Sequence, residues 1–226
     1  MHLHPLGPLP TTLDEAAAQQ ETLSSLVEAT GPGPSDVRTV AGIDVAHTDG
    51  TADVVAAVVV LDATTLRPVE TRTARACAGH PYQSGFLALR ELPAVTAALE
   101  ALDTVPDLII CDGAGVAHPR RFGLACHVGL LTDRSTIGVA KTPPVPFEMP
   151  KPARGSWTPQ LDGDEVVGRA LRTQHGVRPV FVSVGHRIGL DAACDHVLRF
   201  ARHRLPETTR RADRLARDAA LRPVVE

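Results

Sequence analysis

The spacing of apolar residues alternates along the chain between a helical period and a strand period. Between residues 11 and 30 apolar side chains recur every three or four positions, which predicts a helix with Thr11 and Thr12 as caps. The run Gly31-Pro-Gly-Pro34 ends this helix. Three strands are predicted next, joined by short turns: 40–47, 52–61 and 68–77. Consecutive strands joined in this way form an antiparallel meander.

After the meander, helical and strand patterns alternate. The predicted helices are 85–102, 122–131, 189–204 and 207–221. The predicted strands are 108–112, 135–140, 165–171 and 179–184, of which the last two are expected to pair. This order predicts the α/β class, with a mixed sheet in which an antiparallel three-strand meander is joined by parallel strands and flanked by helices.

The length of 226 residues fits one domain spanning residues 1–226. Within this domain we expect an N-terminal helix and linker at 1–34. The segment 142–160 is rich in proline, which predicts a surface loop or an irregular strand. No apolar run approaches the length of a bilayer span, and the N-terminus lacks the basic start and apolar core of a secretory signal. We therefore expect a monomeric cytoplasmic protein with no membrane partner.

Charge and cysteine content narrow the function classes. The formal net charge of −3 argues against a protein that coats nucleic acid in general. However, residues 1–90 hold 5 Lys and Arg against 10 Asp and Glu, whereas residues 91–226 hold 18 against 16. Basic groups thus concentrate in the later part, as a local phosphate-facing surface requires. The 4 cysteines include no CxxC pair and the 10 histidines no HExxH spacing, so we expect reduced cysteines and no structural zinc site.

Two aspartates interrupt apolar strands. Asp44 lies between Ile43 and Val45, and Asp112 ends the run Leu108-Ile-Ile-Cys111. A buried carboxylate is costly unless it binds a metal or accepts hydrogen bonds, and a few carboxylates with open positions suit Mg²⁺. The competing interpretation is that each aspartate caps a strand or forms a turn, because Asp-Gly is a common turn dipeptide.

Other residues are ordinary when taken one at a time. Glu91 and Asp213 lie on predicted helices, where acidic residues usually face solvent. Lys141 closes a strand and is a candidate point charge for phosphate, and His186 follows a strand as a site residue or a capping residue does. The segment after Asp112 combines flexible backbone with basic side chains, as phosphate chemistry requires: Gly113, Gly115, His118, Arg120 and Arg121.

Together, six blocks of sequence closely resemble the endonuclease V family, the deoxyinosine 3′-endonucleases, from about Val40 to Asp213. The blocks are Ala41-Gly-Ile-Asp-Val45, Pro81-Tyr82 with Gly85-Phe-Leu87 and Arg90-Glu91, Asp112-Gly113 through Ala117-His-Pro-Arg-Arg-Phe-Gly123, Gly138-Val-Ala-Lys141, Val184-Gly-His-Arg187, and Leu205-Pro-Glu207 to Arg210. Any one block is weak evidence, but six in the family's order are very specific.

The resemblance implies a ribonuclease H-like fold and a nuclease that uses Mg²⁺, or Mn²⁺ in its place, on inosine-containing DNA and in some members RNA. By position, the catalytic and metal-binding acids are Asp44, Glu91, Asp112 and Asp213, with Lys141 near the scissile phosphate. Tyr82 matches the aromatic of a wedge that splits the strands beside the lesion. The positions lining a pocket for the flipped base are Gly85, Leu87, Gly113 and Leu124.

The resemblance further implies a nick at the second phosphodiester bond 3′ to deoxyinosine, leaving a 3′-hydroxyl and a 5′-phosphate, in the repair of deaminated adenine. Three positions depart from the family's usual pattern. The wedge is Pro81-Tyr-Gln-Ser84 in place of Pro-Tyr-Ile-Pro, Gly113-Ala-Gly115 replaces Gly-His-Gly, and His47 stands where a tyrosine is common. The alternatives are an inosine-specific endoribonuclease and a non-catalytic nucleic-acid-binding relative.

Overall fold

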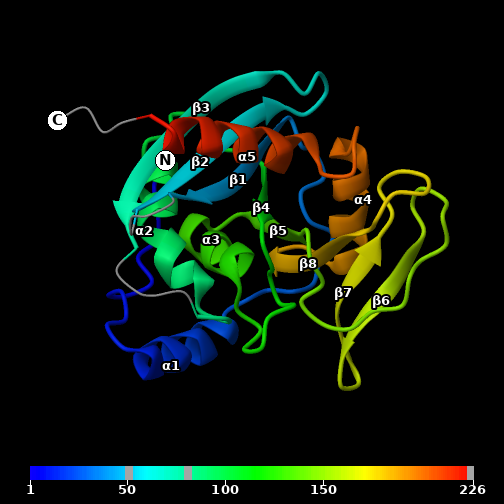
Figure 1. Ribbon diagram of the computed structural model, residues 1–226, viewed down its shortest axis with the longest axis horizontal. Coiled ribbons are helices and arrows are strands. Elements are labelled where there is room, and N and C mark those ends of the chain that lie inside the picture. Colours follow the sequence, from blue (N-terminus) through cyan, green and yellow to red (C-terminus); the bar gives the residue numbers. More distant parts are fainter. Residues whose placement is uncertain (49–52, 79–82, 223–226) are drawn as a thin grey trace.

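One mixed sheet runs through the molecule (Figure 1). The computed structural model describes residues 1–48, 53–78 and 83–222. These form eight strands in the order β3-β2-β1-β4-β5-β8-β7-β6. The strands are β1 (Thr39–His47), β2 (Asp53–Asp62), β3 (Pro68–Cys77), β4 (Leu108–Asp112), β5 (Ser135–Ala140), β6 (Trp157–Asp162), β7 (Glu165–Leu171) and β8 (Val180–His186). The helices are α1 (Leu13–Ser24), α2 (Leu87–Glu100), α3 (Leu124–Thr132), α4 (Leu190–Phe200) and α5 (Glu207–Ala220).

The pairing of the strands confirms the predicted class. β1, β2 and β3 form the antiparallel meander, whereas β1, β4 and β5 are mutually parallel neighbours. The remaining strands are antiparallel, and β7 pairs with β8 as predicted for the two late strands. Because β1, β4 and β5 run side by side in one direction, the residues at their carboxyl ends lie at the same edge of the sheet.

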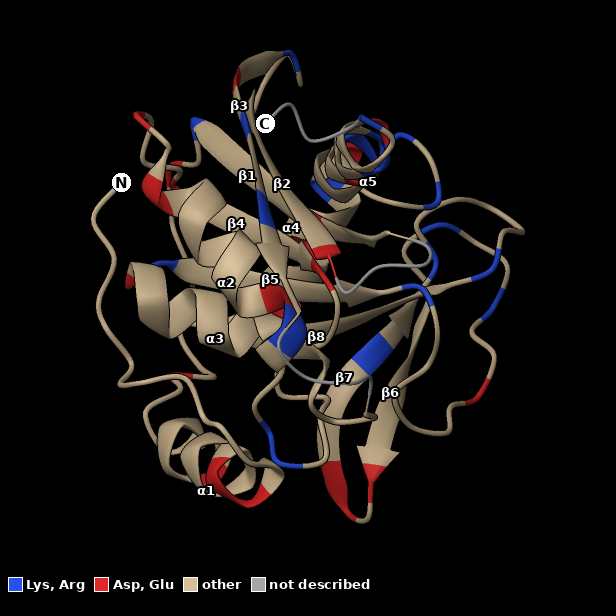
Figure 2. Cartoon of the chain, turned by 60° about the vertical axis from the view of Figure 1, so that its left-hand side comes forward, with Lys and Arg blue, Asp and Glu red and all other residues tan. Residues whose placement is uncertain are grey.

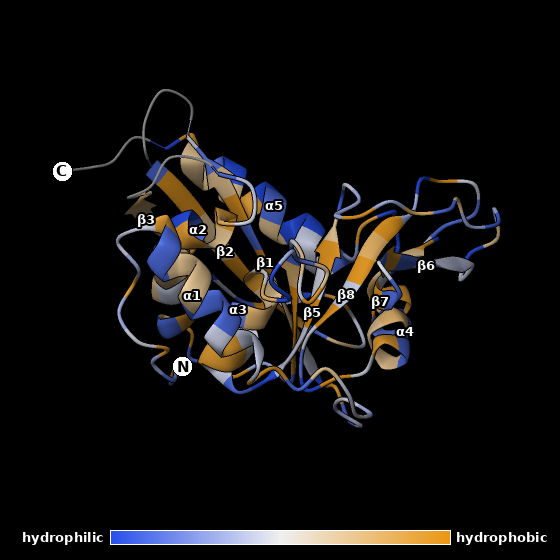
Figure 3. Cartoon of the chain, turned by 90° about the horizontal axis from the view of Figure 1, so that it is seen from below, coloured by the Kyte–Doolittle hydropathy of each residue, from blue (hydrophilic) through white to orange (hydrophobic). Residues whose placement is uncertain are grey.

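Helices cover both faces of the sheet, since alternate residues of each strand belong to different cores. On β4, Leu108 and Ile110 pack in the core that includes residues of α4 and α5, whereas Ile109 and Cys111 pack with residues of α2 and α3. The central strands are accordingly apolar on both faces, as Figure 3 shows by their colour. The helix α5 crosses β1 and β2 (Figure 1).

Local sequence sets the helix ends. Thr12 caps α1 as predicted, because its side-chain oxygen accepts from the Glu15 amide and the Glu15 side chain accepts from the Thr12 amide. The predicted helix at 85–102 begins only at Leu87, since Gly85 has φ +79, a left-handed conformation that ends any helix. All four cysteines are free thiols, as expected, and all but Cys77 are buried. None of the helices in the described ranges has the length and apolar character to cross a bilayer.

The segment 142–160, predicted as a surface loop or an irregular strand, contains both. Its last residues begin β6, which pairs with β7 from Trp157 onward. Proline lacks an amide hydrogen and is normally excluded from a sheet interior, but β6 is an edge strand, where one side of the backbone needs no partner. Pro159 is therefore compatible with the strand, and the prolines before Trp157 remain outside it.

Gly42 fixes how closely α5 approaches β1. A Cβ atom at Gly42 would lie 2.2 Å from the backbone carbon and oxygen of Thr208, which backbone atoms cannot accommodate. We expect Gly42→Ala to lower the free energy of unfolding by about 3 kcal/mol, measured by urea denaturation. At Gly176 a Cβ would meet nothing within 4 Å, and only φ +74 opposes it. Gly176→Ala, the control, should cost about 1 kcal/mol; equal losses would contradict the close-approach explanation.

Candidate active site

Three neighbouring parallel strands deliver charged residues to one edge of the sheet. Asp44 follows Ile43, which is in register with Cys111, so that Asp44 and Asp112 lie on adjacent strands at the same level. Asp112 is in register with Val139 of β5, and Lys141 follows that strand. Asp213 comes from α5, which packs across β1. Figure 2 marks the acidic and basic residues along the chain, and adjoining red and blue segments lie on α2 beside the β5 label.

The three aspartates surround one ammonium group. One carboxylate oxygen from each of Asp44, Asp112 and Asp213 lies within 4.8 Å of the others. The Lys141 Nζ is 3.0 Å from Asp213 Oδ1 and 3.6 Å from Asp44 Oδ2, and it also pairs with Asp112 Oδ2. The structure thus brings together four of the five residues for which the sequence predicted a catalytic role.

Burial and neighbouring charges shift the pKa values of the clustered aspartates and of Lys141 in different directions. Burial raises the pKa of Asp44 to about 8, and the nearby Asp112 carboxylate adds to this effect, whereas Lys141 opposes it. Partial burial would also raise the pKa of Asp213, but its contacts with Lys141 and Arg217 outweigh it, so that this pKa falls below the usual range. Burial lowers and the three carboxylates raise the pKa of Lys141, and the carboxylates prevail.

The donor set fits a divalent cation. Three carboxylates supply only hard oxygen ligands, the type that Mg²⁺, Mn²⁺ and Ca²⁺ prefer. Lys141 contacts all three acids and Arg217 contacts Asp213, so two cations face three carboxylates and further positive charge can be accommodated. Asp44, Asp112 and Asp213 are therefore the residues that would hold the ion.

The predicted fourth acid approaches from the other face of the sheet. Glu91 lies on α2 and is buried, and its Oε1 is 3.2 Å from His47 Nε2. Burial raises the pKa of Glu91, although His47 acts in the opposite direction. Within the described residues the cluster of mutually close ligand atoms comprises the three aspartates alone, so Glu91 stands beside Asp112 rather than inside the cluster.

The acidic residues line two cavities. One, here called the acid cavity, has a volume of about 250 Å³ and is lined by Asp44, His47, Lys141, Asp213 and Arg217 with neighbouring backbone. The other, the glycine cavity, has about 160 Å³, and its walls include Glu91 and Asp112. The predicted base-pocket residues line the glycine cavity together with His118: Gly85, Leu87, Gly113 and Leu124. The acids therefore lie between a charged cavity and a mainly apolar one.

His118 and Arg120 hold the backbone that enters α2. Both donate to the Gly85 carbonyl, His118 from Nε2 at 3.0 Å and Arg120 from Nη2 at 2.8 Å. The Arg120 guanidinium also lies 4.1 Å from the centre of the Phe86 ring. Burial lowers the pKa of His118 to about 4, so this imidazole is neutral near pH 7. Their side chains thus position one wall of the glycine cavity.

Two predicted nucleic-acid-binding residues lie elsewhere. Gly115 packs against β8, where a Cβ would come within 1.9 Å of the Val184 oxygen, and it donates to Ser183 Oγ. His186 is paired with Thr136, at the opposite end of β5 from Lys141, and its Nδ1 accepts from the Glu28 amide. Both residues thus make packing contacts within the chain, and their contact with nucleic acid stays a prediction. Tyr82 lies outside the described residues.

Arg217 was missed by the sequence analysis, and His47 was noted only as a departure. Arg217 follows Asp213 by four residues on α5, and residues spaced i and i+4 share one face of a helix. That spacing is the signal that could have identified it.

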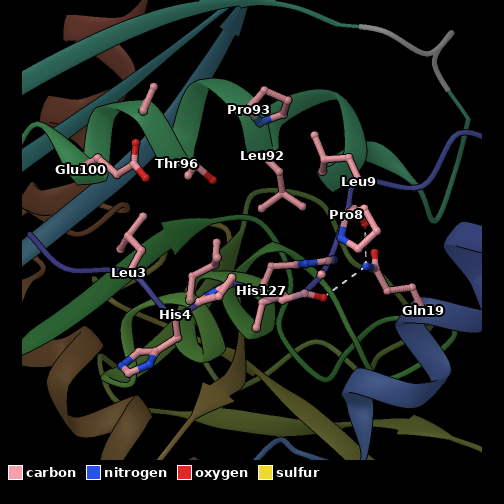
Figure 4. A pocket seen from close by; sticks show the side chains of 15 residues that line it. Leu3, His4, Pro8, Leu9, Gln19, Leu92, Pro93, Thr96, Glu100 and His127 are labelled. Carbon is pink, nitrogen blue, oxygen red and sulfur yellow. Dashed lines mark hydrogen bonds between the residues drawn. The ribbon is translucent and has the colours of Figure 1, made fainter.

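A third cavity, of about 370 Å³, lies away from the acids, between residues 3–9, α2 and α3 (Figure 4). Burial lowers the pKa of its lining residue His127 to about 3, so that imidazole is neutral near pH 7.

Comparison with known proteins agrees with this geometry. A model of the endonuclease V family matches residues 21–214. Endonuclease V of Streptomyces avermitilis is 55% identical over 214 residues, covering 93% of each chain. The crystal structure of endonuclease V from the same organism superposes with a TM-score of 0.90 at 55% identity, covering 95% of each chain.

Two more distant structures resemble the chain. Ciona intestinalis endonuclease V, in complex with a 24mer DNA containing an inosine followed by a ribo-adenosine, has a TM-score of 0.80 at 27% identity and covers 92% of this chain and 97% of its own. Aquifex aeolicus Argonaute shares only the fold, with a TM-score of 0.50 at 19% identity over 84% of this chain and 29% of its own.

These likenesses and the sheet order define a ribonuclease H-like protein, which confirms the predicted fold. The chain belongs to the endonuclease V family. The predicted enzyme class, a deoxyribonuclease, is confirmed with it.

The raised pKa of Asp44 predicts how the stability of the metal-free protein depends on pH. The folded protein keeps the Asp44 proton up to about pH 8, whereas an ordinary aspartate releases it near 3.8. The folded state binds more protons between these values, so the free energy of unfolding should fall as the pH rises from about 4 to about 8. Asp44→Asn should reduce this fall, measured by thermal unfolding in a chelator at pH 5 and pH 8. Equal falls in both proteins would contradict the assignment.

Proposed function

We propose that this enzyme nicks DNA at the second phosphodiester bond 3′ to deoxyinosine, leaving a 3′-hydroxyl and a 5′-phosphate, in the repair of deaminated adenine. The observation that carries the proposal is the convergence of Asp44, Asp112 and Asp213 on Lys141 beside a cavity walled by glycines. The first feature suits phosphodiester hydrolysis, and the second suits inspection of a base.

The proposed cofactor is Mg²⁺, or Mn²⁺ in its place, held by the three aspartates. When bound, such an ion lowers the pKa of water and neutralises charge that develops on phosphate. The chain's own contribution is to fix the three carboxylates on rigid strands and on α5 before substrate arrives. Lys141 adds a positive charge that faces the acid cavity and stays protonated, since the carboxylates around it raise its pKa.

The glycine cavity is the proposed site for the extruded base. An enzyme that acts at a particular base usually extrudes it from the duplex, at a cost that is lowest for a weakly paired base such as inosine. Gly85 and Gly113 carry no side chain, so backbone groups can approach the edge of the base, while Leu87 and Leu124 supply apolar contact. Guanine differs from inosine's base by a 2-amino group, which a tight backbone wall excludes. Tyr82 is retained as the proposed wedge from the sequence alone.

The placement of the two cavities supports cleavage at a distance from the lesion. The base would occupy the glycine cavity, which Asp112 lines, whereas Lys141 and Asp213 line the separate acid cavity. A strand whose lesion lies in the first cavity would therefore place a neighbouring nucleotide's phosphate, rather than the lesion's own, at the three aspartates. This offset is consistent with a nick beyond the first phosphodiester bond.

A nicking assay with matched backbones tests the proposal. Four oligonucleotides would carry inosine with deoxyribose or ribose at the lesion and at its 3′ neighbour, and each would be incubated with the enzyme and Mg²⁺. The proposal predicts rapid nicking of the all-deoxy strand at the second bond and no nicking of an adenine control. Cleavage only where ribose is present would establish the endoribonuclease alternative. This alternative is worth testing because the DNA bound to the Ciona relative contains an inosine followed by a ribo-adenosine. Binding with no cleavage of any strand would establish the non-catalytic alternative.

A further inference from the structure

Arg217 is a second cationic residue of the acid cavity. It lies one helical turn after Asp213 on α5, and its Nη2 is 3.0 Å from Asp213 Oδ1. The same oxygen is 3.0 Å from Lys141 Nζ, so one carboxylate oxygen orients two cations. The Arg217 side chain nevertheless remains 70% exposed. Arg217 is thus directed by the acid cluster while most of its guanidinium faces solvent.

We propose that Arg217 binds a backbone phosphate of the nicked strand, on the side of the cleavage point away from the inosine. This inference rests on the proposed function, because it takes the base to occupy the glycine cavity and the strand to continue into the acid cavity. A guanidinium presents five N–H donors in a planar fork that matches the oxygens of a phosphate. Asp213 accepts from Nη2, which leaves the outer edge of the fork directed to solvent.

Lys141 and Arg217 have different roles because their surroundings differ. Lys141 has carboxylate oxygens from three aspartates around it and is only about a third exposed, so it compensates the acids. Arg217 has an acid partner on one side and faces the mouth of the same cavity with the other. Residues that neutralise phosphates on both sides of a scissile bond align the strand, and such contacts fix register without reading sequence.

The competing explanation is that Arg217 and Asp213 form an ordinary surface ion pair. Such i, i+4 pairs contribute little to stability and are common on exposed helices. The chain offers a control on the same helix, because Arg214 and Asp218 form an ion pair with the same i, i+4 spacing, although in the reverse sequence order. The Arg214 side chain is 81% exposed and lines a different cavity, formed with β2 and β3. Arg214→Ala therefore removes the same charge and an ion pair of the same spacing without touching the acid cavity.

The experiment compares Arg217→Ala, Arg217→Lys and Arg214→Ala with the wild-type enzyme. Affinity for an inosine-containing duplex is measured at several salt concentrations in Ca²⁺, and nicking is measured under single-turnover conditions in Mg²⁺. Arg217→Ala should weaken binding about tenfold and reduce the slope of log affinity against log salt by about 1. Arg217→Lys should restore the slope but only part of the affinity, since an ammonium is a point charge. Arg214→Ala should bind and nick like the wild type.

Two outcomes overturn the inference. If Arg217→Ala and Arg214→Ala have equal affinities and salt slopes, Arg217 is a surface ion pair. If Arg217→Ala keeps its affinity for DNA and loses only affinity for Mn²⁺ in a direct titration, its role is confined to orienting Asp213. Failure of the proposed function is a separate result, because it would appear as a wild-type enzyme that does not nick inosine-containing DNA. Affinity for an undamaged duplex would still report whether Arg217 contacts phosphate.

Discussion

Asp44→Asn is expected to reduce Mg²⁺-dependent nicking of inosine-containing DNA by several orders of magnitude. The substitution replaces a charged ligand by a neutral amide in the middle of the cluster that Asp112 and Asp213 complete. The remaining two aspartates would then hold a divalent ion weakly and in altered geometry. The rate is measured under single-turnover conditions with enzyme in excess, so that slow product release does not mask the rate of the chemical step.

The control for Asp44→Asn is Asp164→Asn, which removes an exposed aspartate in the turn between β6 and β7. It should nick at the wild-type rate. Titration of Mn²⁺ should show weaker binding to the Asp44 variant, while thermal unfolding shows an intact fold. Near-normal nicking by Asp44→Asn would remove the acid cluster from the mechanism, and with it the main support for the proposed function.

Gly113→Val is expected to reduce inosine cleavage on the order of 100-fold while metal binding is retained, because a displaced base no longer presents its neighbouring phosphate correctly. Gly113 forms a wall of the glycine cavity, and a Cβ there would contact Leu124 at 3.7 Å. That distance is ordinary for one carbon, so the added methyl groups of valine extend into the space proposed for the base. A β-branched residue also resists the φ of +147 at this position.

Gly113→Ala separates filling of the cavity from strain in the backbone. Both variants adopt the unfavourable φ, but alanine adds a single carbon at van der Waals distance. A graded loss, slight for alanine and large for valine with Mn²⁺ affinity unchanged in both, supports the base pocket. Loss of metal affinity together with cleavage would mean that Asp112, the preceding residue, has moved, and would count against placing the base beside Gly113.

The local sequence alone was enough to single out the carboxylates on strands as candidate site residues, but not the carboxylates on helices. Asp44 and Asp112 interrupt apolar strands, and an acid in such a position demands a compensating partner wherever the fold places it. Glu91 and Asp213 have the local sequence of ordinary surface acids, so only resemblance to a family singled them out. Their approach to the strand ends depends on how α2 and α5 pack on opposite faces of the sheet, which no local pattern encodes.

Contacts between distant segments are the part of the site that local sequence does not show. The predicted binding of nucleic acid by His118 and Arg120 stays a prediction, and in the structure both donate to the carbonyl of Gly85, more than thirty residues earlier in the chain. His186 serves a similar purpose for the segment at Glu28. Residues of this kind belong to a sequence motif because their side chains hold the backbone around the site in place. The sequence did not decide between a loop and an irregular strand at 142–160, because the proline of β6 is unfavourable in most strands and is tolerated only at the edge of a sheet.

The order of the four clustered residues along the chain has a consequence for synthesis. Asp44 emerges from the ribosome first, Asp112 and Lys141 follow, and the helix that carries Asp213 comes after them and packs on the first strand. A growing polypeptide therefore cannot assemble the complete cluster until α5 has emerged. Products terminated before α5 lack the third aspartate and the helix that covers β1.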